Sequence, residues 1–405
     1  MSIKYLMFQD GVQKVISILT FVILARVFDH DTFGSYQQII LIISVSTMLF
    51  VAGVPTGLSY FSGKSLDKEK PTVHTTFFIF QTYMACIAII ILAVSLNGIA
   101  TAFDNKFIQD NQKLIIVAVV GSVYLAFFRN YANLIGDLKY LSILSSIIKT
   151  IGLIGITLSA LFLYEIKYAI YIMAFSSFSV FALLMYRYRR LFRTSNKINR
   201  KELSYVIYMA SVSFIGAING YVDQLVTSLL MTPSQLAILK VGAFQIPIVG
   251  IVTGALVTVL IPIISRKYSN NDIQGIIKVW KRSILNSSTL IVPVITFCIV
   301  FSDIFIPLFF GNNYLDSIII FNIYMFQWYR SVVIYSAVMG AIGLQRSLFI
   351  NTILFTGLNL IFNLLVAESY GIVGIACVTI IINYTSAYSL HRYISRKLTI
   401  KFTDY

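Results

Sequence analysis

The sequence has few of the residues that build metal or catalytic sites, with only three cysteines and three histidines in 405 residues. The histidines lie far apart in the chain, and no HExxH, Ser/His/Asp, phosphate-loop or Gly-rich dinucleotide motif is present. The cysteines have neither metal-ligand spacing nor an extracellular pairing pattern: Cys86, Cys298 and Cys377. We therefore expect no metal, no cofactor and no enzymatic activity.

Charged residues are also scarce, at 12% of the chain against 58% hydrophobic residues, which excludes a soluble domain. The apolar residues form about twelve stretches, each long enough to cross a bilayer at roughly 20 residues. The runs are continuous and lack a period of two, which favours helices over a barrel. We place the spans at 6–27, 35–60, 74–96, 113–134, 140–163, 166–186, 205–231, 236–264, 280–302, 318–344, 347–367 and 371–391.

Basic residues are almost absent from every second loop between these stretches. One side of the predicted membrane has 22 Lys and Arg residues, and the other side has 3, which are Lys106, Lys113 and Lys167. By the positive-inside rule, both termini lie in the cytoplasm and the number of spans is even. Because this topology explains the net charge of +15, we expect no nucleic-acid partner. No small-residue cleavage site follows the first stretch, which predicts a retained helix rather than a signal peptide.

The chain divides at the Arg-rich loop 187–204, which predicts an N-terminal lobe at 1–195 and a C-terminal lobe at 196–405. Gly136-Asp137 after the fourth span is echoed by Gly343-Leu344 after the tenth. With six spans in each half, both halves insert in the same orientation. The predicted fold is an all-α integral membrane protein of about twelve transmembrane helices. Its two six-helix lobes would be related by a pseudo-two-fold axis along the membrane normal.

Prolines fall inside several predicted spans, where each removes a backbone donor and bends a helix. They could shape the bundle statically or act as hinges during transport, and the sequence leaves both readings open. They are Pro55, Pro247, Pro262 and Pro293.

Several segments together resemble one transporter family. Residues 25–36 read A-R-V-F-D-H-D-T-F-G-S-Y, residues 310–314 read F-G-N-N-Y, and residues 340–346 read G-A-I-G-L-Q-R. Asn359 and Asn363 precede Y-G-I-V-G-I-A at 370–376, and Asp223 lies in the seventh span. In order and spacing these segments resemble the polysaccharide flippases often called Wzx, of the multidrug/oligosaccharidyl-lipid/polysaccharide exporter superfamily. The family's Leu-Gly in the first segment is Phe28-Asp29 here.

The resemblance implies two lobes around a central cavity in the cell inner membrane. It implies movement of undecaprenyl-diphosphate-linked oligosaccharide, such as an O-antigen repeat unit, from the cytoplasmic to the periplasmic leaflet by alternating access. The implied partners are this lipid-linked oligosaccharide diphosphate and membrane lipids. Polysaccharide polymerase and chain-length proteins are further candidate partners.

After the charges assigned to the loops are set aside, eight ionisable residues remain in the membrane, and six of them are bases: Asp10, Lys14, Arg26, Arg129, Lys149, Asp223, Lys240 and Arg330. A charge in hydrocarbon is costly and usually faces a cavity or a partner, and an excess of bases suits a diphosphate pathway. The candidate substrate-binding residues are Arg330, Lys149, Arg129 and Lys14. Alternatives remain open, because Lys14 could pair with Asp10 at i,i+4 and Arg129 could extend to the interface. Arg26 and Lys240, near the outer ends of their spans, are expected to anchor at the interface.

Asp223 is the candidate ion-coupling residue, because a carboxylate within a span can take up and release a proton during transport. A salt bridge to a neighbouring span is the alternative. Polar and aromatic residues of the seventh and tenth spans could add hydrogen bonds or sugar stacking, although Tyr and Trp are also ordinary residues of the membrane interface: Asn219, Tyr324, Gln327, Trp328 and Tyr329.

Three other functions are alternatives to a flippase. A membrane polysaccharide polymerase would need a large outer loop with catalytic residues, and the outer loops are short and acidic. A major facilitator transporter shares the twelve-span plan, and residues 63–68 mimic part of its loop motif, but Glu69-Lys70-Pro71 does not continue it. A drug exporter of the same superfamily usually takes cationic substrates, which the bases within the spans would repel.

Overall fold

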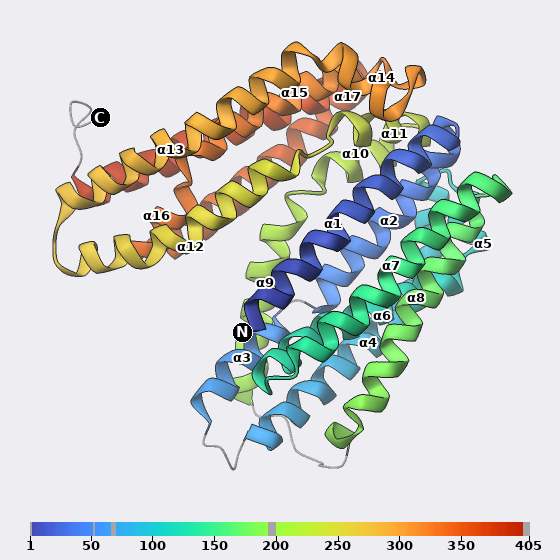
Figure 1. Cartoon of the computed structure of the whole chain (residues 1–405), viewed down its shortest axis with the longest axis horizontal. Coiled ribbons are helices and arrows are strands. Elements are labelled where there is room, and N and C mark those ends of the chain that lie inside the picture. The colour runs from blue at the N-terminus through green and yellow to red at the C-terminus, as the bar shows by residue number, and fades with distance from the viewer. Residues whose placement is uncertain (1, 52, 66–69, 193–199, 400–405) are drawn as a thin grey trace. The chain divides into compact units, whose positions relative to one another are not determined.

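The computed structural model describes residues 2–51, 53–65, 70–192 and 200–399 (Figure 1). Every regular element in these ranges is a helix, so the predicted all-α class is confirmed. The chain packs as two compact units, one of Met1–Tyr221 with Thr232–Ala237 and one of Val222–Met231 with Ile238–Tyr405. The predicted boundary at residue 195 precedes α9 (Arg200–Ile218), which packs against α2 and α3 of the first unit.

Nine helical segments of the described chain are long and apolar enough to cross a membrane. They cover ten of the twelve predicted spans, because α17 (Gln345–Leu398) alone contains the last two. The remaining predicted spans are also helical. Residues 6–27 lie in α1, and residues 205–231 are divided between α9 and α10 (Val222–Leu230).

The first unit is a helical bundle in which α1 lies along α7, while α6 packs against α2, α4 and α8 (Figure 1). The Thr20 and Thr157 hydroxyls, 3.3 Å apart, join α1 to α7. Its helices are α1 (Ser2–Val27), α2 (His30–Val51), α3 (Val54–Lys64), α4 (Lys70–Ala102), α5 (Lys106–Asp110), α6 (Gln112–Leu134), α7 (Leu138–Leu163), α8 (Lys167–Arg187), η1 (Arg189–Phe192) and α9.

The junction of α1 and α2 shows what two residues of segment 25–36, Asp29 and Gly34, do in the fold. The Asp29 carboxylate accepts hydrogen bonds from the backbone N–H groups of Asp31 and Thr32, at 3.2 and 3.1 Å, and so caps α2. Burial alone would raise the pKa of Asp29, but hydrogen bonds, chiefly with Thr32, lower it. A Cβ atom on Gly34 would lie 1.8 Å from the Pro233 carbonyl oxygen, so only glycine allows this approach.

The second unit is built around α12, α13, α15 and α17, with α10 against α17 (Figure 1). Trp280 and Ile264 are fully buried in its core with residues of α16 and the end of α17. Gly371, at φ 59° and ψ −154°, breaks α17 at the first residue of the twelfth predicted span, directly after the predicted loop. The helices are α10, α11 (Pro233–Gly242, shared with the first unit), α12 (Pro247–Ser269), α13 (Ile273–Val300), α14 (Ser302–Phe310), η2 (Asn312–Tyr314), α15 (Ser317–Tyr329), η3 (Arg330–Val333), α16 (Tyr335–Ala341) and α17.

The four prolines occupy two kinds of position. Pro55 and Pro247 lie in the first turns of α3 and α12, where a missing backbone N–H costs no helical hydrogen bond. Pro262 and Pro293 lie inside α12 and α13. The first pair therefore marks interruptions of the predicted spans rather than bends within a continuous helix.

The sequence similarity between the two halves corresponds to two helix-ending turns with the same backbone conformation. Gly136 and Gly343 adopt φ values of 77° and 80°, which suit glycine. The next residues, Asp137 and Leu344, donate backbone hydrogen bonds of 2.8 and 2.9 Å to carbonyls five residues earlier. Both turns therefore have the pattern of a Schellman motif, which ends a helix at a left-handed glycine.

Candidate functional site

Asp223 lies within the second unit, in the first turn of α10. The chain arrives there through a turn at 219–221, which separates α10 from α9. Val222 and Val226 of α10 pack with Ala367 and Ile375 of α17, on either side of the Gly371 break. This apolar contact holds the start of α10 against both segments of α17.

Four neutral side chains surround the Asp223 carboxylate. Its Oδ1 atom accepts hydrogen bonds from Thr379 Oγ1 at 2.6 Å, Asn363 Nδ2 at 2.9 Å and Asn359 Nδ2 at 3.4 Å. The Tyr324 hydroxyl of α15 donates to Oδ2. None of these four side chains is more than 6% exposed, so buried donors from three helical segments converge on the half-buried Asp223.

No base of the described residues forms an ion pair with Asp223. Lys240 of α11, also in the second unit, instead contacts Gln224 Oε1 at 3.2 Å. The salt bridge that the sequence left open is thus absent from the described side chains. A buried carboxylate with only neutral donors stays uncompensated when ionised, which is costly unless a proton or another cation is taken up.

The cluster also supplies oxygen atoms beyond those of the carboxylate. Asn363 Oδ1 is buried without a hydrogen-bond partner among the described residues, and Asn359 Oδ1 accepts from Thr379 at 3.1 Å. Hard cations prefer carboxylate, amide and hydroxyl oxygens. The described residues contain no group of three His, Cys, Asp or Glu side chains suited to a metal. The cluster thus brings carboxylate, amide and hydroxyl oxygens together at one place in the second unit.

Arg330, the leading predicted substrate ligand, lies at an interruption of the tenth predicted span in the second unit. It follows α15 and begins the short helix η3, and Ile334 then adopts a left-handed φ of 52°. Arg330 Nε is buried and has no hydrogen-bond partner in the described part of the chain. A guanidinium with unused donors is suited to phosphate oxygens.

The other predicted ligands lie in the first unit. Lys149 of α7 and Arg129 of α6 are half-buried, whereas Lys14 of α1 is not covered by protein. The side chain of Asp10, the alternative partner of Lys14, lies outside the described residues. The structure therefore leaves the roles of these bases as predictions.

Two aromatic or polar candidates from the sequence contact other side chains of the second unit. Gln327 Oε1 accepts a 3.0 Å hydrogen bond from Asn383, and the Tyr329 hydroxyl lies 2.9 Å from Thr296. Thr379 is a member of the cluster that the sequence did not identify as a candidate. Threonine in a helix commonly bonds to its own backbone, so its type gives no signal of a distant partner.

Comparisons with known proteins support the fold and a family. A family model described as polysaccharide biosynthesis protein matches residues 23–319. The structure of a lipid II flippase, MurJ, in an inward closed conformation has 15% identity and a TM-score of 0.77, covering 98% of this chain and 89% of that one. An inward-facing multidrug resistance MATE transporter of the MOP superfamily has 12% identity and a TM-score of 0.75, covering 96% and 94%.

A third structure, of a MOP superfamily transporter from Pyrococcus furiosus Vc1 (DSM3638), has 13% identity and a TM-score of 0.65, covering 98% of this chain and 94% of that one. No curated protein sequence matches the chain. At such low identities, the structural likeness establishes the fold of flippases and transporters of the MOP superfamily, and it does not establish the cargo.

Proposed function

The chain belongs to the polysaccharide biosynthesis protein family, and we propose that it is a flippase that moves a lipid-linked oligosaccharide across the membrane. The family match carries this proposal, and the shared fold with a lipid II flippase supports it. The cargo would be an undecaprenyl-diphosphate-linked repeat unit of an O-antigen or similar surface polysaccharide. Alternating access would carry it from the cytoplasmic to the periplasmic leaflet of the inner membrane. The charge asymmetry of the loops supports cytoplasmic termini.

Asp223 would couple transport to an ion gradient. Its carboxylate has neutral donors only, so binding a proton or an alkali cation would remove an uncompensated charge. Because α10, α15 and both segments of α17 meet at this carboxylate, an ion bound there would favour one arrangement of these helices over another. That differential binding is what a coupled transporter requires.

Arg330 would bind the diphosphate, since its buried Nε has no partner in the described chain. Lys149, Arg129 and Lys14 are further proposed ligands, on the grounds of the sequence. Removal of the Arg330 charge should abolish transport at normal protein levels. Full surface glycan display by Arg330→Ala would contradict this role.

The test of the function is complementation of a strain that lacks this chain, with surface glycan and lipid-linked intermediates measured together. The wild-type chain should restore glycan display and clear repeat units held on the cytoplasmic leaflet. Repeat units that reach the outer leaflet unpolymerised in the deletion strain would instead indicate a polymerase.

The coupling role is tested with Asp223→Asn against Asp303→Asn in the same strain. Both acids lie in the first turn of a nine-residue helix, α10 or α14, but Asp303 is exposed and outside the cluster. We expect Asp223→Asn to lose transport at normal protein levels and Asp303→Asn to retain it. Equal transport by the two variants would contradict coupling at Asp223.

The second candidate function is drug or small-solute export, favoured by the likeness to a multidrug resistance transporter. It predicts that deletion changes drug susceptibility while surface glycan stays unchanged. The same deletion strain distinguishes the two functions.

A further inference from the structure

A pocket of about 590 Å³ lies in the first unit, where the end of α6, the start of α7 and the end of α8 come together. By the charge asymmetry of the loops, this end of the three helices faces the cytoplasm. Apart from Ile135 and Asp137, its lining residues are all tyrosines or arginines: Tyr131, Tyr140, Tyr186, Arg187, Tyr188 and Arg189.

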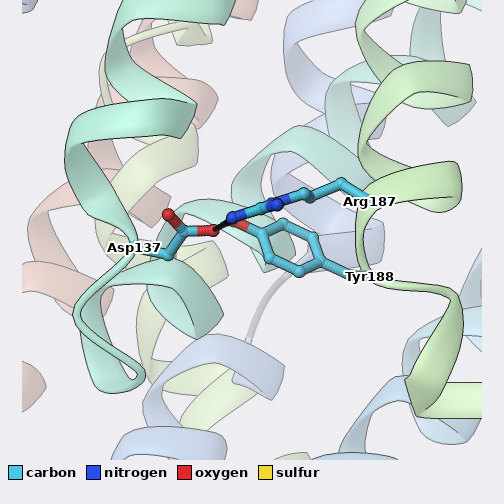
Figure 2. Close-up of polar contacts among 3 residues, drawn as sticks. All are labelled: Asp137, Arg187 and Tyr188. Carbon is cyan, nitrogen blue, oxygen red and sulfur yellow. Dashed lines mark hydrogen bonds and ion pairs between the residues drawn. The ribbon is translucent and has the colours of Figure 1, made fainter.

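The polar centre of the pocket is an acid held by two neighbours (Figure 2). Asp137, in the turn between α6 and α7, accepts hydrogen bonds on Oδ2 from Nε and Nη2 of Arg187 at 3.2 and 3.1 Å. The Tyr188 hydroxyl donates to the same oxygen at 3.2 Å. Burial and the Asp137 charge raise the pKa of Tyr188, so its hydroxyl remains a donor. Asp137 is therefore neutralised within the pocket.

Each of the two arginines lies over a tyrosine ring. The Arg187 guanidinium lies 4.8 Å from the centre of the Tyr140 ring, and that of Arg189 lies 5.1 Å from the centre of the Tyr186 ring. Such contacts hold each guanidinium over a ring and leave N–H groups for a further acceptor: those of Arg189, and the Nη1 group of Arg187, which Asp137 does not use. Among the described residues, Arg189 forms no ion pair with an acid.

Charge and position together identify the ligand class. After the Asp137–Arg187 pair is counted, the Arg189 charge remains, so the pocket favours an anion. Tyr186 and Tyr140 are 70% and 40% exposed, at the end of helices long enough to span a membrane. Amphipathic rings at that level mark the membrane interface, and basic pockets between helices on the cytoplasmic side bind anionic headgroups.

We propose that this pocket binds the phosphate headgroup of an anionic phospholipid of the cytoplasmic leaflet, with Arg187 and Arg189 as the phosphate ligands. The lipid would be a resident ligand of the first unit and would not be the transported cargo. This proposal goes beyond the proposed function, and its test does not depend on transport.

The experiment is native mass spectrometry of the purified full chain in detergent, titrated with dioleoyl phosphatidylglycerol or dioleoyl phosphatidylcholine. We expect selective retention of phosphatidylglycerol. Since a base near an anionic surface contributes about fivefold, Arg189→Gln should weaken retention about fivefold and Arg187→Gln/Arg189→Gln about thirtyfold. Arg189→Gln leaves the Asp137 contacts intact, so it tests binding even where the double variant folds poorly.

The matched control is Lys278→Gln/Arg282→Gln, which removes two exposed bases from α13 on the same predicted side of the membrane. It should retain phosphatidylglycerol as the wild type does. Equal losses in the control and the pocket variants, or equal retention of phosphatidylcholine, would overturn the proposal.

Two competitors identify the source of the phosphate. Inorganic phosphate and an isoprenyl-diphosphate sugar are each added to the phosphatidylglycerol complex, and we expect neither to displace the lipid at equal concentration. Displacement by inorganic phosphate would assign the pocket to a soluble anion. Displacement by the isoprenyl diphosphate would assign it to the cargo, and either result would overturn a resident lipid.

Discussion

If Asp223 is ionised among neutral donors, the hydrogen bond from Thr379 should contribute more to stability than an ordinary one. Hydrogen bonds to charged groups contribute about 1.5–3 kcal/mol, against about 0.5–1.5 kcal/mol for neutral pairs. The Thr379 hydroxyl donates to Asp223 at 2.6 Å and is 6% exposed, so solvent cannot replace it. Thr379→Val, which keeps the shape of the side chain, should therefore destabilise the second unit by about 2 kcal/mol.

The same substitution should cost less when the charge is gone. In an Asp223→Asn background, Thr379 meets a neutral amide, and we expect its replacement by Val to cost about 1 kcal/mol. Asp223→Asn alone should leave the protein at least as stable as the wild type, because it removes a buried charge without a counter-ion among the described residues. The double-mutant cycle then has a coupling free energy of about 1 kcal/mol.

The assay is denaturant-induced unfolding in mixed micelles, with the four proteins compared at one pH and one salt concentration. Additive costs, within about 0.3–0.5 kcal/mol, would refute the reasoning that an ionised carboxylate organises the cluster. If Asp223 is protonated instead, Thr379→Val should cost the same in both backgrounds, and the two substitutions would be additive. The cycle thus measures the charge state directly, without any transport assay.

Two further predictions concern structure outside this cluster. Gly34→Ala should greatly reduce the monodisperse folded peak in size-exclusion chromatography, because its Cβ atom would lie 1.8 Å from the Pro233 carbonyl oxygen. The control is Gly98→Ala, whose Cβ atom would have no neighbour within 4 Å, and it should behave as the wild type. Asp272 has a lowered pKa, through hydrogen bonds from Lys267 and a backbone N–H. The folded state is therefore stabilised above the ordinary aspartate pKa of 3.8, and this stabilisation is lost as pH falls through the lowered pKa. Asp272→Asn should flatten the pH dependence of unfolding in that range.

The helical class and most of the span positions could be predicted because a bilayer forces the backbone to bond within each apolar stretch. The glycine turns after the fourth and tenth spans were also visible, since Gly136 and Gly343 stand at matching places in the two halves. The Gly371 break lies at the first residue of the twelfth predicted span, one residue after the predicted loop. In each of these cases the residues of the segment itself determine the backbone conformation, so the sequence was sufficient to predict it.

The composition of the Asp223 cluster was only partly predictable. The sequence singled out Asp223, Tyr324, Asn359 and Asn363 but did not group them, because they meet through packing over 101 to 140 positions of chain. Thr379 lies 156 positions from Asp223 and was not singled out at all. Arg187 and Asp137 were counted as loop charges of opposite sign, and only the structure shows that they form one site.

Asp223 and Arg330, two ionisable residues of the second unit, lie at interruptions of predicted spans, and this position helps to explain why their charges are tolerated. Asp223 follows the turn at 219–221 and stands in the first turn of α10, while Arg330 caps the end of α15. A carboxylate at a helix N-terminus and a guanidinium at a helix C-terminus both complement the helix dipole. The carbonyls released after Arg330 accept hydrogen bonds from side chains of α13, Ser287 Oγ to the Val332 oxygen at 2.9 Å and Trp280 Nε1 to the Val333 oxygen at 2.7 Å. At the Arg330 break, side chains of α13 therefore bind two of the carbonyls that the helix releases, and each of the two breaks brings a helix end to a charge that it stabilises.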